Sequence, residues 1–197
     1  MSAVLEMPDV AGPPAPRLLT AADLDALPDC LPSGPVKYEL HYGVLKIMAP
    51  PGFIHGLTQL RFGRSFAQKC EDTGLGMATG EVGLILGRNP DHVLGPDACF
   101  ILNDSLPVRL SKEGYLETIP ELIIEVRSKN DTMAELQVKA AEYLRAGVRV
   151  VLVSDFATLR VIAYRDGQAP QVFGPNDELT VPDLLPNFAV AVRSLFP

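Results

Sequence analysis

The chain has 197 residues, of which 47% are hydrophobic and 21% are charged, a composition typical of one soluble globular domain. No apolar run approaches the roughly 18 residues needed to cross a bilayer, and the N-terminus lacks the basic and apolar regions of a secretory signal, so we expect a cytoplasmic protein. The net charge of −7 argues against broad, nonspecific affinity for nucleic acid, so any phosphate-binding surface must be local.

Absent motifs exclude several chemistries. The three cysteines, Cys30, Cys70 and Cys99, have no C-x-x-C spacing, which argues against a disulfide framework and a cysteine zinc site, and we expect reduced, mostly buried thiols. The glycines between residues 74 and 80 are expected in a turn that leads to a strand, not in a phosphate-binding loop. No G-x-S-x-G sequence is present, which argues against a serine hydrolase.

The N-terminal part divides into a leader and the start of a domain. Residues 1–16 are rich in proline without an apolar period, and we interpret them as a flexible leader to a single domain over residues 17–197. Thr20 is a predicted N-cap of a short helix. Alternation over residues 36–48 predicts a hairpin, with Glu39 on its polar face.

The next segments alternate between helix, strand and loop. Apolar residues at helical spacing over residues 54–70 predict a helix of about four turns. Residues 82–86 are a predicted short strand, and residues 87–95 a polar loop. Turn formers without a clear period over residues 103–119 indicate a loop with a helical turn.

A carboxylate stands inside each of two apolar, strand-like runs. Asp97 lies in residues 96–102 and Glu125 in residues 120–126, where the period places Glu125 on the same face as Ile123. Burying an unpaired carboxylate in such a run costs roughly several kcal/mol unless a cation lies beside it. We therefore expect the two carboxylates to lie on neighbouring strands, close enough to share one divalent cation.

An amphipathic segment follows the second acidic run. Its apolar residues from Met133 to Leu144 repeat at helical spacing, and Gly147 is placed to end the helix. Lys139 lies on the border of the apolar face, and we expect its amine near Glu125. The chain then continues with two predicted strands, residues 150–154 and 159–165. In the tail, residues 179–181 and 188–192 are expected to form short strands or an edge cover.

Each of these candidate residues also has a purely structural interpretation. Asp97 could start a strand and accept backbone amides, and Glu125 could form a buried ion pair with Arg127 or Lys139. Lys139 alone is typical of a solvated lysine at a helix boundary. The three histidines have no ligand spacing, and we expect each to be a surface or helix-start residue: His41, His55 and His92.

An ordered set of motifs carries a family resemblance. The set comprises Tyr38-Glu39-Leu40 with Gly43, His55 opening a helix, Pro96-Asp97, Ile124-Glu125-Val126-Arg127-Ser128, Lys139 before Tyr143, and Ala146-Gly147-Val148. With this order the chain resembles the Uma-two family of restriction endonucleases, within the PD-(D/E)XK nuclease superfamily. It departs from the superfamily at Arg127, where a lysine is usual, and from the family at Lys129, which replaces a proline.

The resemblance implies an α/β restriction-endonuclease-like core, with a mixed central sheet flanked by helices and the N-terminal hairpin as an addition. It implies a phosphodiesterase that depends on Mg²⁺ or Mn²⁺, acts on DNA and forms a homodimer. Asp97, Glu125 and the carbonyl of Val126 would hold the metal. Lys139 would be the catalytic lysine and Glu39 an accessory acid.

The net negative charge requires a local surface for nucleic acid, and we expect four cations to contact phosphates: Arg61, Arg64, Arg127 and Lys129. A rival interpretation is a catalytically silent nuclease-like fold that acts as a binding or interaction module. A phosphatase or RNase with the same metal chemistry also stays open.

Overall fold

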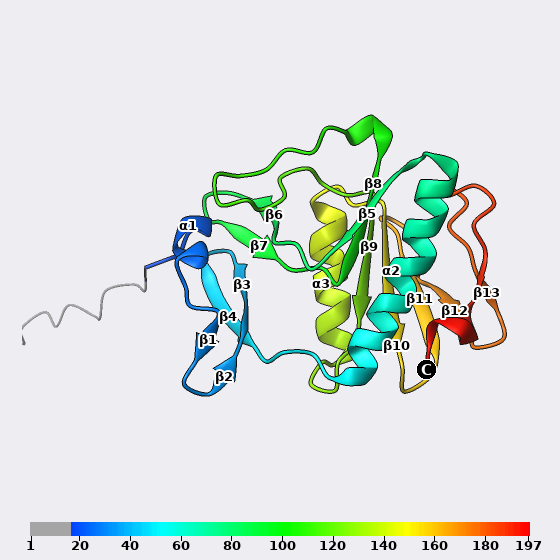
Figure 1. The fold of residues 1–197 in the computed structure, drawn as a ribbon, viewed down its shortest axis with the longest axis horizontal. Helices are drawn as coiled ribbons and strands as arrows, with labels where there is room; N and C mark the ends of the chain where they lie inside the picture. The colour runs from blue at the N-terminus through cyan, green and yellow to red at the C-terminus, as the bar shows by residue number, and fades with distance from the viewer. Residues whose placement is uncertain (1–16) are drawn as a thin grey trace, which may run out of the picture.

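The computed structural model describes residues 17–197, and the predicted leader over residues 1–16 lies outside the described residues. A six-stranded sheet, a four-stranded sheet, two small two-stranded sheets and three α-helices form an α/β fold over the described residues (Figure 1). The helices are α1 (Ala21–Asp25), α2 (Phe53–Thr73) and α3 (Met133–Arg145). In the described part of the chain, no helix is long and apolar enough to cross a membrane.

The larger sheet has six strands in the order β12-β11-β10-β9-β8-β5. Their bounds are Gly76–Gly80 (β5), Ala98–Leu102 (β8), Leu122–Val126 (β9), Val150–Asp155 (β10), Arg160–Tyr164 (β11) and Gln171–Phe173 (β12). Strands β9 and β10 are parallel and every other pair is antiparallel, so the sheet is mixed, as expected.

Helices cover both faces of this sheet. Alternate residues of β9 pack on opposite sides: Ile124 lies in one core with Phe62 and Phe66 of α2, and Ile123 in another with Tyr143 of α3. Figure 1 shows the sheet between these two helices. Because Glu125 shares a face with Ile123, its side chain is on the α3 side of the sheet.

The smaller sheet has four strands in the order β4-β3-β7-β6. Strands β3 (Lys37–His41) and β4 (Val44–Met48) form the predicted hairpin. Strands β6 (Leu84–Gly87) and β7 (His92–Leu94) extend it. The prediction of a loop over residues 87–95 was wrong at β7, because the polar residues of the β6–β7 turn precede three buried residues that pair with β3.

The prediction of a turn around Gly76 was also wrong, since residues 76–80 form the edge strand β5. Gly76 pairs with Leu102 of β8, and a Cβ at Gly76 would lie 2.1 Å from the carbonyl oxygen of Ile101. Glycine is therefore required by the close approach of two strands.

Short elements complete the described chain. They are β1 (Cys30–Leu31), β2 (Gly34–Pro35), β13 (Glu178–Leu179), β14 (Val190–Ala191) and two 3₁₀ turns, η1 (Asn103–Ser105) and η2 (Val192–Leu195). The turn η1 lies in the region predicted as a loop with a helical turn.

Candidate active site

Asp97 and Glu125 lie opposite one another at the end of a strand pair. Ala98 of β8 pairs with Ile124 of β9 in antiparallel register, so one step outward brings Asp97 against Glu125. Residues directly opposite in an antiparallel pair share a face of the sheet. Asp97 Oδ2 also accepts a hydrogen bond from the backbone amide of Val126 at 2.7 Å. Asp97 and Glu125 are therefore neighbours, as the sequence pattern of the two acidic runs predicted.

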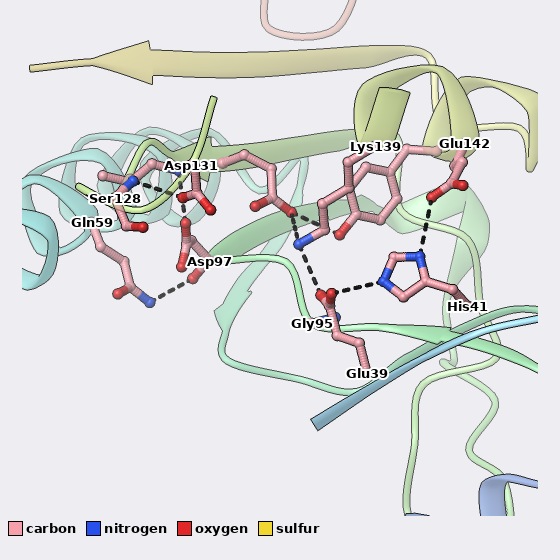
Figure 2. A network of polar contacts seen from close by, with 12 residues as sticks. Glu39, His41, Gln59, Gly95, Asp97, Ser128, Asp131, Lys139 and Glu142 are labelled. Carbon is pink, nitrogen blue, oxygen red and sulfur yellow. Dashed lines mark hydrogen bonds and ion pairs between the residues drawn. The ribbon is translucent and has the colours of Figure 1, made fainter. Parts of the chain in front are cut away.

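Lys139 lies between two buried carboxylates. Its Nζ is 3.0 Å from Glu125 Oε1 and 2.9 Å from Glu39 Oε1. The proximity to Glu125 is the one that the sequence predicted, whereas the contact with Glu39 joins α3 to the N-terminal hairpin. Figure 2 shows the side chains of Lys139 and Glu39 pointing toward one another.

The alternation of the hairpin placed Glu39 on a polar face, but in the structure this face is not exposed. Only 1% of the residue is exposed, because α3 lies over this face of β3. Glu39 Oε1 accepts a hydrogen bond from the Gly95 amide at 2.9 Å, and Glu39 Oε2 lies 3.2 Å from His41 Nε2. Alternation identified the shared polar side of the strand but not the helix that covers it.

The charges in this cluster perturb one another. Burial raises the pKa of Glu125 to about 7; the Lys139 ammonium opposes this shift, and the negative charges of Asp97 and Glu39 add to it. Burial alone would also raise the pKa of Glu39, but the His41 hydrogen bond and Lys139 outweigh burial and lower the pKa to about 2. Burial alone would lower the pKa of Lys139, yet its two carboxylate partners raise it. Lys139 therefore stays charged.

Tyr143 is a site residue that sequence analysis assigned only to the apolar face of the helix. Its hydroxyl donates a hydrogen bond of 2.7 Å to Glu125 Oε1, and the residue is fully buried. The available signal was its position four residues after Lys139, one helical turn along the same face, because a buried tyrosine hydroxyl needs a partner.

His55 holds the other oxygen of Asp97. It lies in the first turn of α2, as expected, and its Nε2 is 2.9 Å from Asp97 Oδ1. Burial lowers the pKa of His55, but the hydrogen bond and charge of Asp97 outweigh burial and raise it. With the Val126 amide on Oδ2, Asp97 also fits the structural reading of a residue that accepts backbone amides.

The four predicted phosphate contacts differ in their surroundings. Arg61 donates to the carbonyl oxygens of Ser194 and Phe196, so it holds the C-terminal segment against α2. Arg127 pairs with Asp155 at 3.1 Å, not with Glu125. Arg64 and Lys129 have exposed side chains.

A cavity of about 380 Å³ opens beside Asp97, between the N-terminal hairpin and the start of β8. Its lining combines apolar and charged groups, including Tyr38, Lys37, Glu81 and Asp97. Lys37 pairs with Glu81 at 2.7 Å across this lining. Of the clustered carboxylates, Asp97 belongs to the lining, whereas Glu125 and Glu39 do not.

The expectation that the histidines are isolated was wrong for two of them. His92 is buried, and it lies with His41 and Glu142 so that one ligand atom from each is within 4.8 Å of the others. Spacing along the chain could not reveal this group, because the three residues come from β3, β7 and α3.

Comparison with known proteins agrees with this architecture. The model of the Uma2 (Uma-two) family, described as "putative restriction endonuclease", matches residues 21–193. No curated protein matches the chain. A solved structure from Anabaena variabilis ATCC 29413, described as "a putative nuclease belonging to DUF820", has a TM-score of 0.73 and 20% sequence identity, over 90% of this chain and 97% of that chain. At this identity the similarity shows the fold, and the predicted restriction-endonuclease-like core is confirmed.

Proposed function

Because the chain belongs to the Uma2 family of restriction endonuclease-like proteins, we propose that it is a metal-dependent endonuclease that hydrolyses phosphodiester bonds in DNA. The observation that carries the proposal is the buried cluster in which Asp97 lies opposite Glu125 and the Lys139 ammonium is 3.0 Å from Glu125. Such a cluster is expensive for a purely structural role, since buried charges cost more to desolvate than their attraction usually returns.

The donor set fits Mg²⁺ or Mn²⁺. Both ions prefer carboxylate and carbonyl oxygens, which Asp97, Glu125 and the Val126 carbonyl would supply. The cluster holds three carboxylates and one ammonium, and Lys139 contacts two of the three, Glu39 and Glu125. The charges of Asp97 and Glu39 help to keep the pKa of Glu125 high, so the site favours a further cation. When bound, the ion would lower the pKa of a water and neutralise charge on the scissile phosphate.

The protein's own groups then have distinct roles. Lys139 acts as a fixed cation that stabilises negative charge developing on the phosphate, because its raised pKa keeps the ammonium protonated and leaves it no lone pair to act as a base. Glu39 and Tyr143 position Lys139 and Glu125 through their direct contacts. His55 orients the Asp97 carboxylate through Oδ1, while the Val126 amide binds Oδ2.

Capture of DNA by a chain with a net charge of −7 would depend on local cations. Arg64 on α2 and Lys129 after β9 have exposed side chains, which supports a phosphate-contact role for them. Arg61 and Arg127 already have protein partners, so any contact they make with DNA would compete with those partners. The family resemblance extends the proposal to a homodimer, which light scattering tests by measuring the mass in solution.

One observation favours a second candidate function, a nuclease-like fold that binds without cleaving. Lys139 and Tyr143 both contact Glu125 Oε1, and His55 and the Val126 amide contact the two oxygens of Asp97, so three of the four carboxylate oxygens have protein partners without an ion. Binding of DNA without cleavage under any metal condition would identify this function.

The decisive experiment is a cleavage screen with plasmid, linear DNA, single-stranded DNA and RNA, each with Mg²⁺ or Mn²⁺. We expect metal-dependent cleavage of DNA by the wild type and its loss in Asp97→Asn and Glu125→Gln. The matched control Asp72→Asn changes an exposed acid of α2 and should cleave like the wild type. Wild-type rates in Asp97→Asn and Glu125→Gln would contradict the assignment.

A further inference from the structure

A second cluster of titratable groups lies beside the candidate active site. It contains His41 at the end of β3, His92 at the start of β7 and Glu142 on α3. His41 is two residues after Glu39, and Glu142 is three residues after Lys139, so the cluster follows the Glu39–Lys139 pair along the same strand and helix. Figure 2 shows His41 between Glu39 and Glu142.

The three side chains converge on one carboxylate oxygen. Glu142 Oε2 is 3.5 Å from His92 Nε2 and 3.8 Å from His41 Nδ1. The side chain of His92 is only 4% exposed, and within residues 17–197 its buried Nε2 has no hydrogen-bond partner. A buried polar atom without a partner is rare in native proteins, and a bound ion is one of the groups that satisfy such an atom.

The contacts of His41 favour a particular tautomer. Its Nε2 is 3.2 Å from Glu39 Oε2, and in the neutral ring the Nε2–H donates a hydrogen bond to that carboxylate oxygen. The lone pair then lies on Nδ1, which faces Glu142. Histidines that bind a metal commonly donate their other ring N–H to a carboxylate in this way, which fixes the ring and its tautomer.

We propose that His41, His92 and Glu142 form a second metal site, selective for Zn²⁺ or a similar transition metal. Two imidazoles and one carboxylate are a ligand set that Zn²⁺ accepts, with a water in the fourth position, whereas Mg²⁺ prefers oxygen ligands alone. Zn–N bonds of about 2.0–2.1 Å place the ligand atoms of a tetrahedral site roughly 3.3 Å apart. The two distances to Glu142, 3.5 and 3.8 Å, are close to this value. The two imidazoles, whose ligand atoms lie within 4.8 Å of one another, would move closer together when the ion binds.

The site would connect parts of the fold that are distant in sequence. The two histidines come from the four-stranded sheet and Glu142 from the helix that packs on the six-stranded sheet. A bound ion would clamp these layers together and, through His41, fix Glu39 against Lys139. This inference does not depend on the proposed nuclease activity.

The test is isothermal titration of Zn²⁺ into metal-stripped full-length protein, with Co²⁺ absorption as a second readout. We expect one site with the visible spectrum of tetrahedral Co²⁺, and at least tenfold weaker binding at this site in Glu142→Gln and His41→Ala. The matched control Asp97→Asn removes a ligand of the other proposed site and should retain this one. Zinc binding that Asp97→Asn abolishes and Glu142→Gln leaves unchanged would overturn the proposal.

Imidazole nitrogen NMR of the wild type keeps the test valid if a variant fails to fold. The chain has only three histidines, so each can be followed. Zn²⁺ should shift His92 Nε2 and His41 Nδ1, and the histidine beside Asp97, His55, serves as the internal control. Zinc-dependent shifts confined to His55 would contradict the site.

Discussion

At the scale of single residues, the central feature is the Lys139 ammonium between Glu39 and Glu125. Each carboxylate is almost fully buried, and Lys139 is within 3.0 Å of both. Removing one partner of a buried ion pair is more damaging than never having had the pair, because the remaining charge stays desolvated. We therefore expect Lys139 to contribute to the stability of the fold as well as to the proposed chemistry.

Replacing Lys139 by methionine should lower the free energy of unfolding by about 3–5 kcal/mol, because it leaves two buried carboxylates without their cation. Urea denaturation with and without Mn²⁺ measures this effect. Mn²⁺ should stabilise Lys139→Met more than the wild type, since the ion supplies the missing positive charge. The control Lys112→Met changes an exposed lysine and should be neutral. Equal stability of Lys139→Met and the wild type would show that the pair contributes nothing.

Metal affinity should depend on pH through Glu125. Burial raises the pKa of its carboxyl to about 7, so a proton competes with the metal below that pH. The apparent association constant for Mn²⁺ should therefore rise about tenfold per pH unit up to about pH 7 and then level off. Calorimetric titration across this range measures the profile.

Tyr143→Phe provides the directional control for this profile. The Tyr143 hydrogen bond lowers the pKa of Glu125, so its removal should move the plateau to higher pH. Burial shifts a carboxyl pKa into the range between about pH 5 and pH 8. An association constant for Mn²⁺ that does not change across this range would exclude Glu125 as a ligand.

At the scale of elements, local pattern predicted the segments that form the site. The strand β9 agrees with the alternation over residues 122–126, and α3 has the expected apolar face, with a capping box at Thr132. The strands β5 and β7 were missed for different reasons. The glycines of β5 are typical of turns, but at Gly76 glycine instead permits the close approach of a neighbouring strand. The strand β7 has three residues, too few to show the alternation of a strand in the sequence.

The close approach at β5 predicts opposite effects for two glycines. Gly76→Ala should destabilise the protein because its Cβ would lie 2.1 Å from the Ile101 carbonyl oxygen. Gly63→Ala, inside α2 with nothing within 4 Å of its Cβ, should raise stability by about 0.5–1 kcal/mol. Thermal unfolding of both variants checks the contrast, and a stable Gly76→Ala would require β5 to lie elsewhere.

Replacing the two arginines of α2 should have different effects on stability and on DNA binding. Arg61→Ala should lower stability by about 1 kcal/mol because it releases the carbonyl oxygens of the C-terminal segment. Arg64→Ala should leave stability unchanged and reduce the salt slope of DNA binding by about one unit. Denaturation and binding titrations at several salt concentrations measure both effects. A salt slope changed by Arg61→Ala alone would reverse the assignment.

At the scale of the whole molecule, the site lies where the N-terminal hairpin, the six-stranded sheet and α3 meet. Sequence pattern predicted that Asp97, Glu125 and Lys139 lie near one another, because two carboxylates inside apolar runs are conspicuous and one face of a helix follows from its period. Pattern could not locate the partners that complete the cluster. The Glu39–Lys139 contact spans 100 positions and the His41–Glu142 contact spans 101, and both depend on how β3 docks against α3.

The most direct test of the central claim is an anomalous-scattering map from crystals grown with Mn²⁺. We predict an ion within coordination distance of carboxylate oxygens of both Asp97 and Glu125, adjacent to the Val126 carbonyl, with Lys139 still beside the site. A map at saturating Mn²⁺ with no ion between Asp97 and Glu125, and the Lys139 ion pairs unchanged, would contradict the account.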